Sequence, residues 1–164
     1  MIVFGIDPGY ALTGYGVIEY KGNRFRVLDY GVVSTKPGVP MDRRLLQIAE
    51  ELEELIATAK PDAVAIEELF FSRNVTTAIA AAQGRGVAIV TAARAGIPVF
   101  EYTPMQVKQA VSGYGKADKK QVQEMVRILL ALEAIPKPDD AADALAIAIC
   151  HAHAGTGWTS GRMV

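Results

Sequence analysis

Two acidic residues stand where apolar segments of the chain end. Asp7 follows the apolar segment 2–6 and precedes a Pro-Gly turn, and Glu67 follows the apolar segment 63–66. Both segments are short and continuously apolar, which predicts strands that are buried on both faces. Because α/β sheets bind ligands beyond the carboxyl ends of their strands, we expect Asp7 and Glu67 to share one site.

A second pair of acids lies in the C-terminal part of the chain. Residues 139–153 follow two prolines and form an apolar run rich in alanine, which predicts a helix that begins near Asp139. Asp140 and Asp143 are three residues apart and therefore share one face of this helix. An alternative is that Asp139 or Asp140 caps the helix. Asp143 lies among apolar residues, which assigns it to the packed side.

The four acids predict a particular chemistry if they converge. Carboxylates a few ångströms apart raise each other's pKa unless cations neutralise them. Hard oxygen ligands without nearby cysteine or paired histidine select Mg²⁺, for which Mn²⁺ can substitute, over zinc. Two such ions stabilise both the attacking water and the departing oxygen in phosphodiester hydrolysis. We therefore expect two ions per site and no covalent nucleophile.

Composition favours one enzyme domain. A chain of 164 residues that is 51% hydrophobic and 21% charged can bury a sizeable core without disulfides. The lone Cys150 falls in an apolar helix, where a reduced thiol in a cytoplasmic protein is expected. There is no basic leader and no uninterrupted apolar span, so we expect neither export nor membrane insertion. We assign residues 1–154 to a nuclease domain and 155–164 to a flexible tail.

The remaining segments predict the elements that must position these acids. Two further strands, at 13–20 and 25–33, are joined by a hairpin turn. Apolar residues at helical spacing predict helices, and a last apolar segment predicts a strand. The helices are expected at 41–59, 74–95, 104–111 and 118–132, and the strand at 97–102. This order is that of an α/β, ribonuclease H-like fold, a five-stranded mixed sheet flanked by helices.

The helix predicted at 74–95 contains Gly84 and Gly86. Each glycine costs about 1 kcal/mol relative to alanine, so a close contact with the backbone is expected to offset this. Two kinds of contact would explain the glycines, either tight packing of the helix on the sheet or packing at a dimer interface.

Seven collinear blocks of the sequence resemble the RuvC family of Holliday-junction resolvases, over nearly the whole chain. The resemblance implies a homodimer that binds a four-way DNA junction and makes paired, symmetrical nicks, leaving 5′-phosphate and 3′-hydroxyl ends. It also implies Mg²⁺ and cooperation with the RuvA and RuvB branch-migration proteins. The blocks are Gly5-Ile6-Asp7-Pro8-Gly9 with Thr13-Gly14-Tyr15-Gly16, Ala65-Ile66-Glu67, residues 83–90, Pro98-Val99-Phe100-Glu101-Tyr102, Gln106-Val107-Lys108-Gln109 and residues 140–148.

The resemblance also implies roles for individual residues. Lys108 and Lys119 match basic positions near the scissile phosphate, and Phe70 matches an aromatic residue that stacks on an unpaired base. Its neighbour Phe71 is expected to cover the core. Glu68 is an extra acid, and strand alternation predicts that it points away from the site. The catalytic, metal-binding acids would be Asp7, Glu67, Asp140 and Asp143.

A basic region supports binding to DNA although the net charge is −1. Residues 108–127 carry five basic and two acidic side chains, whereas residues 41–60 carry three basic and five acidic ones. An uneven charge distribution attracts phosphate to one side of a protein. Taken alone, such lysines also fit a solvated helix face. The assigned DNA contacts are Phe70, Arg73, Lys108, Lys116, Lys119 and Lys120.

Three other interpretations have discriminating features. His151 lies eight residues after Asp143, about 12 Å along a helix, which is too far for the same ion, and we assign it to the helix end. The glycine-rich start also resembles actin-like and sugar-kinase ATPases, which need a second domain. A junction-binding protein without nuclease activity would be expected to lack at least one acid, and all four are present.

Overall fold

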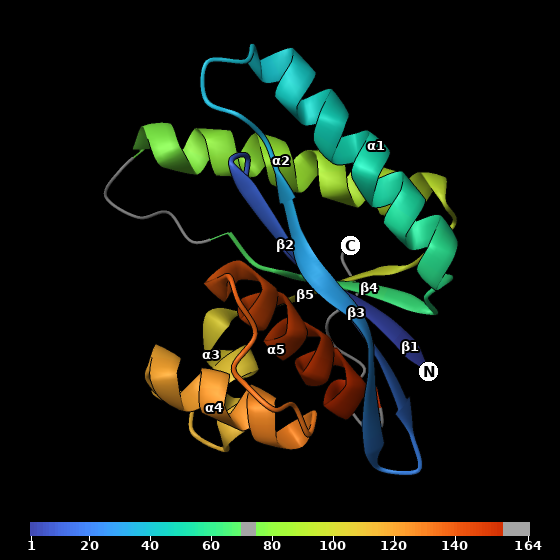
Figure 1. Cartoon of the computed structure of the whole chain (residues 1–164), viewed down its shortest axis with the longest axis vertical. Helices are drawn as coiled ribbons and strands as arrows, with labels where there is room; N and C mark the ends of the chain where they lie inside the picture. The colour runs from blue at the N-terminus through green and yellow to red at the C-terminus, as the bar shows by residue number, and fades with distance from the viewer. Residues whose placement is uncertain (70–74, 156–164) are drawn as a thin grey trace.

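A five-stranded mixed sheet forms the middle layer of the computed structural model, which describes residues 1–69 and 75–155 (Figure 1). β1 pairs antiparallel with β2 and parallel with β4, β2 pairs antiparallel with β3, and β4 pairs parallel with β5. The predicted ribonuclease H-like sheet is therefore confirmed. The strands, in the spatial order β3-β2-β1-β4-β5, are β1 (Ile2–Asp7), β2 (Leu12–Lys21), β3 (Arg24–Ser34), β4 (Ala63–Glu67) and β5 (Val99–Tyr102).

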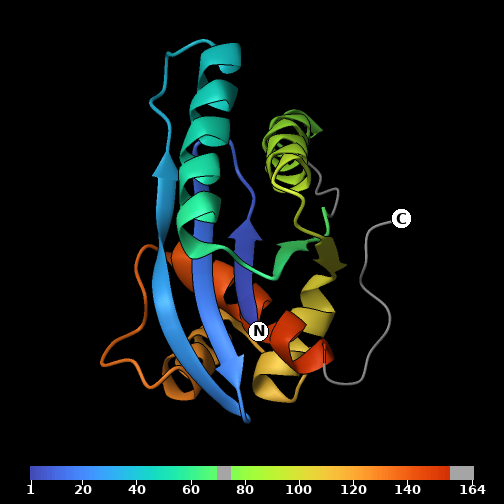
Figure 2. The same cartoon turned by 90° about the vertical axis from the view of Figure 1, so that its right-hand side faces the viewer.

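Helices cover both faces of this sheet. α1 (Met41–Ala59) and α2 (Val75–Arg94) lie on one face, and α3 (Pro104–Ser112), α4 (Lys119–Leu129) and α5 (Asp139–Ala154) lie on the other (Figures 1 and 2). These bounds lie close to the predicted ones. The largest difference is α4, which ends three residues early because Ala131 has a left-handed backbone with φ 51°. No helix within the described ranges is both long and apolar enough to cross a bilayer.

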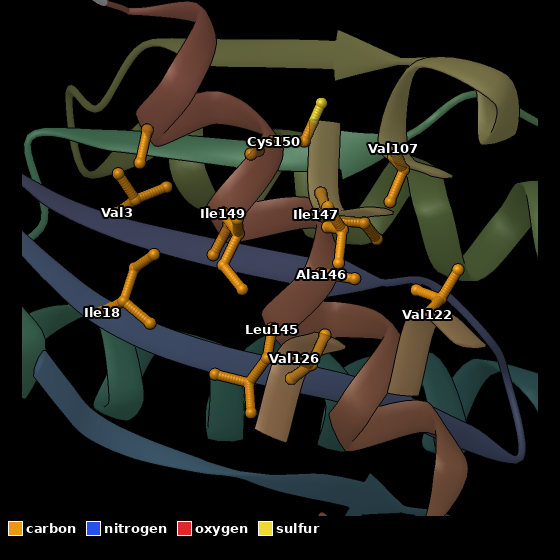
Figure 3. Packing of buried hydrophobic residues seen from close by; sticks show 14 of the residues in the cluster. Val3, Ile18, Val107, Val122, Val126, Leu145, Ala146, Ile147, Ile149 and Cys150 are labelled. Atoms are coloured by element: carbon orange, nitrogen blue, oxygen red, sulfur yellow. The ribbon is translucent and has the colours of Figure 1, made fainter. Parts of the chain in front are cut away.

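α5 lies directly on the sheet because the strands beneath it carry glycines. A Cβ atom at Gly5 would collide with the carbonyl oxygen of Ala144, and one at Gly14 would collide with that of Asp140. The helix is buried along its length, and Leu145, together with other apolar side chains, fills the space between it, α3, α4 and the sheet (Figure 3). Because Gly14 pairs with Asp7, this contact sets the first turn of α5 beside the end of β1.

The two glycines of α2 differ in their surroundings. A Cβ atom at Gly84 would lie 2.6 Å from the carbonyl oxygen of Gly9, so at this residue the helix packs closely on the loop after β1. Ala88 and Ala92 of the same helix share a buried core with residues of the sheet. A Cβ atom at Gly86 would have no neighbour within 4 Å. Gly84 therefore fixes the turn that follows Asp7, whereas Gly86 leaves one side of α2 open.

Candidate active site

The ends of β1 and β4 place two of the acids. The parallel register pairs Ile6 with Ile66, and Asp7 and Glu67 are the next residue on each strand. Both side chains are half-buried. Sequence reasoning predicted this arrangement from the apolar segments alone, since buried parallel strands end at a common edge.

The first turns of α5 supply the other pair. Asp140 and Asp143 are half-buried on this helix. The alternative, that Asp139 or Asp140 caps the helix, is wrong, because the N-cap residue is Pro138 and no side chain makes a capping hydrogen bond. Asp139 forms ion pairs instead, at 3.1 Å with Lys137 and at 3.4 Å with Lys119.

Electrostatic interactions couple the four acids. Burial, followed by the charges of Asp143, Glu67 and Asp140, raises the pKa of Asp7 to about 8. Burial and the charge of Asp143 also raise the pKa of Glu67. The pKa of Asp143 is raised by burial as well, although its hydrogen bond to Lys119 acts in the opposite direction. Asp7 thus experiences the charge of every other acid in the group.

Two lysines lie against these acids. Lys119 opens α4, whose N-terminus is held by a capping box between Asp118 and Gln121, and its Nζ donates to Oδ2 of Asp143 at 3.1 Å. Burial lowers the pKa of Lys119, but the hydrogen bonds and charges of Asp143 and Asp139 outweigh this, so the pKa is raised. Lys108 on α3 lowers the pKa of Glu67 through its charge. A pocket of about 240 Å³ is lined by Glu67, Lys108, Lys119, Asp143 and four other residues.

The donor set fits a hard divalent cation. Its members offer carboxylate oxygens, and their mutual repulsion favours any cation that neutralises them. In the part of the chain that the structure describes, no group of three or more acidic, histidine or cysteine side chains is placed so that it could hold a metal ion. Lys119 supplies the positive charge beside Asp143. An ion held by Asp143 would therefore compete with this lysine.

The predicted DNA contacts are only partly described. Lys116 and Lys120 are exposed, as a phosphate contact requires. Phe70, Phe71 and Arg73 lie outside the described residues, as does the tail beyond residue 155.

Two other titratable residues, His151 and Glu68, were considered in the sequence and do not belong to the group of four acids. His151 is in the last turn of α5, as predicted, but its side chain is buried, and its Nδ1 lies 2.7 Å from the hydroxyl of Tyr102. Burial lowers its pKa to about 4. Glu68 is exposed, and its charge raises the pKa of Arg85 on α2. Its orientation away from the site stays a prediction.

Sequence reasoning missed one residue next to the site. Arg85 donates from Nε to the main-chain oxygen of Glu67 at 3.3 Å and forms an ion pair with Glu101 on β5. The sequence could have drawn attention to Arg85, because it is a basic residue in the middle of a predicted helix rich in alanine and glycine.

Comparison with known proteins assigns the family. The family described as Crossover junction endodeoxyribonuclease RuvC matches residues 3–151. A protein of that name from Ruminiclostridium cellulolyticum is 59% identical over 151 residues, which cover 92% of this chain and 91% of the relative. The structure of T. thermophilus RuvC in complex with a Holliday junction substrate superposes with a TM-score of 0.92 at 39% identity, covering 99% of this chain and 100% of the other. The chain therefore belongs to the RuvC family of crossover junction endodeoxyribonucleases.

Proposed function

We propose that this member of the family is a Mg²⁺-dependent endonuclease that resolves Holliday junctions in recombination and repair. It makes paired, symmetrical nicks that leave 5′-phosphate and 3′-hydroxyl ends. The observation that carries this proposal is the electrostatic coupling of Asp7 to Glu67, Asp140 and Asp143 at one edge of the sheet. The actin-like or sugar-kinase-like alternative gives no reason for an acidic helix end to lie beside Asp7.

Each residue of the group has a part in this reaction. The four acids, Asp7, Glu67, Asp140 and Asp143, would hold two divalent ions, which when bound activate water and stabilise the leaving oxygen. Lys108 and Lys119 lie beside Glu67 and Asp143, and they would neutralise the charge of the scissile phosphate. The side chain of Lys119, now paired with Asp143, would pair with phosphate instead if an ion took its place at that carboxylate.

The DNA surface extends from these lysines. Lys116 and Lys120 are exposed on the segment that links α3 to the first turn of α4, next to Lys119. Arg127 is neutralised by an ion pair with Glu124 and contributes less. We assign phosphate contacts to these lysines and to Arg73, and base stacking to Phe70. The RuvA and RuvB branch-migration proteins are the proposed partners at the junction, in the cytoplasm.

A stripe on α2 fits the homodimer that paired nicks require. Its side chains recur at intervals of three or four residues and therefore share one helix face. Val75, Ile79 and Val90 are 64%, 55% and 56% exposed, and Gly86 leaves room for a second helix to approach. We define the α2 stripe as Val75, Ile79, Ala82, Gly86, Val90 and Ala93.

The α2 stripe can be tested through the oligomeric state. Ile79→Glu together with Val90→Glu is expected to give monomers in light scattering, because two charges would be buried in the interface. Leu46→Glu, at an exposed position on α1, is the matched control and should leave the dimer intact. A doubly substituted protein that stays dimeric would place the interface elsewhere.

Incubation with a synthetic four-way junction tests the activity itself. With Mg²⁺ or Mn²⁺, symmetrical nicks confined to the junction are expected, and a linear duplex of the same sequence should stay intact. Binding to the junction without any cleavage would favour the inactive junction-binding protein. ATP turnover without cleavage would favour the ATPase.

A further inference from the structure

Arg85 connects three elements at the edge of the sheet where the acids lie. It projects from α2, donates from Nε to the main-chain oxygen of Glu67 at 3.3 Å, and forms an ion pair with Glu101 on β5. The arginine side chain is 15% exposed and that of the glutamate 32%. A largely buried ion pair thus joins α2 to β5, and the same arginine bonds to the last residue of β4.

The main chain of Glu67 lies beyond the last paired residues of β1 and β4, so other contacts must hold it in place. Pairing between β1 and β4 ends at Ile6 and Ile66, one residue before Glu67. On its other side, β5 holds the chain, because the amide of Glu68 donates to the carbonyl oxygen of Tyr102 at 2.8 Å. Arg85 therefore adds a contact to Glu67 where the ladder with β1 has stopped.

Packing alone does not explain an arginine at this position. Burial lowers the pKa of Arg85, which means that the charge is partly withdrawn from water at a cost in free energy. An apolar side chain would fill the same space on α2 without this cost. The guanidinium instead meets two groups at once, because its Nε donates to the carbonyl oxygen of Glu67 while its Nη2 forms an ion pair with the carboxylate of Glu101. This arrangement suits a role in orientation.

We propose that Arg85 and Glu101 are a positioning pair that fixes the main chain of Glu67 and thereby directs its carboxylate toward Asp7 and Asp143. The inference rests on the proposed function, in which Glu67 is a metal ligand. Groups that orient metal ligands typically change metal affinity or activity by about 10- to 100-fold when they are removed. The same helix carries the α2 stripe, so the pair also ties Glu67 to the proposed dimer surface.

The test compares two arginines of α2. Arg85→Gln removes the ion pair and the bond to Glu67. Arg94→Gln removes the same charge near the helix end, where Arg94 is exposed and lies 3.7 Å from Glu53. Mn²⁺ binding to the full-length protein without DNA is measured by calorimetry, and junction cleavage is measured against Mg²⁺ concentration.

For Arg85→Gln we expect Mn²⁺ binding weakened by about tenfold and a cleavage curve shifted to higher Mg²⁺, with junction affinity in Ca²⁺ unchanged. Arg94→Gln should behave as the wild type. Arg85→Lys, which keeps the charge beside Glu101, should recover part of the Mn²⁺ affinity. These readouts separate positioning from a merely structural role, which would lower the melting temperature alone.

Wild-type Mn²⁺ affinity in a folded Arg85→Gln protein would overturn the inference and leave the proposed function intact. If Arg85→Gln does not fold, Glu101→Gln is the variant that tests the inference. It removes the ion pair, while the hydrogen bond from Arg85 to Glu67 remains possible. Weaker Mn²⁺ binding by Glu101→Gln supports the positioning pair, and unchanged binding overturns it. A wild-type protein that neither binds Mn²⁺ nor cuts junctions would overturn the proposed function itself.

Discussion

The two ends of α5 bury titratable side chains in contrasting surroundings. At the N-terminal end, burial and the neighbouring charges of Asp140 and Asp139 raise the pKa of Asp143 against the effect of Lys119. At the C-terminal end, burial alone lowers the pKa of His151, whose polar partner is the hydroxyl of Tyr102. Burial beside a neutral partner is typical of a structural residue, whereas burial among like charges indicates a functional site.

The group of acids at the N-terminal end of α5, which includes Asp7 at the end of β1, should lose its nuclease activity when one acid is replaced. Asp7→Asn is expected to reduce junction cleavage at least about a hundredfold, because a metal ligand supplies several kcal/mol of transition-state stabilisation. Junction binding should persist, since the lysines are unchanged. Single-turnover cleavage and a gel-shift assay in Ca²⁺ measure the two properties separately.

Asp42→Asn, an exposed acid on α1, is the control and should cut as the wild type does. Loss of binding together with cleavage in Asp7→Asn would contradict the division between acids that catalyse and lysines that bind.

At the C-terminal end of α5, substitution of His151 should instead change how the free energy of unfolding depends on pH. A folded-state pKa of about 4, below the ordinary value of 6.5, means that the unfolded chain takes up a proton first as the pH falls. The stability from neutral His151 is therefore present above pH 6.5 and is lost between pH 6.5 and 4, by up to about 3 kcal/mol. In urea unfolding, His151→Gln should show a smaller loss over this window than the wild type.

The control for this prediction is Leu46→Gln at an exposed position on α1, because it changes no titratable group. It should keep the wild-type pH dependence. Equal slopes for His151→Gln and the wild type would show that His151 is not buried in its neutral form.

Strand ends and helix spacing allowed much of the site to be predicted. Asp7 and Glu67 could be placed because buried parallel strands end at one edge, and Asp140 and Asp143 because residues three apart share a helix face. The close approach of α5 was harder to foresee. It depends on Gly14 lying under the backbone of Asp140, a contact between distant segments that no local pattern encodes.

Other features escaped sequence reasoning because they depend on partners from elsewhere in the chain. Arg85 reaches Glu67 and Glu101 only after α2 and β5 have packed together. A cap by Asp139 or Asp140 was one alternative, but Asp139 pairs with Lys119 from another helix. His151 was assigned to a helix end, and its burial follows from Tyr102 on β5.

The last prediction is a substitution in the site that is expected to stabilise the folded protein, whereas most substitutions destabilise it. A pKa of Asp7 raised to about 8 means that the folded state holds a proton more tightly than the unfolded chain, so without metal the stability falls as the pH rises from about 4 to 8. Asp7→Asn removes this repulsion and should stabilise the metal-free protein at pH 8. Mg²⁺ should stabilise the wild type more than the variant, because the ion binds the folded acids. Urea unfolding with EDTA and with Mg²⁺ measures both, and a variant less stable than the wild type in EDTA would mean that the acids at this end of α5 do not repel one another.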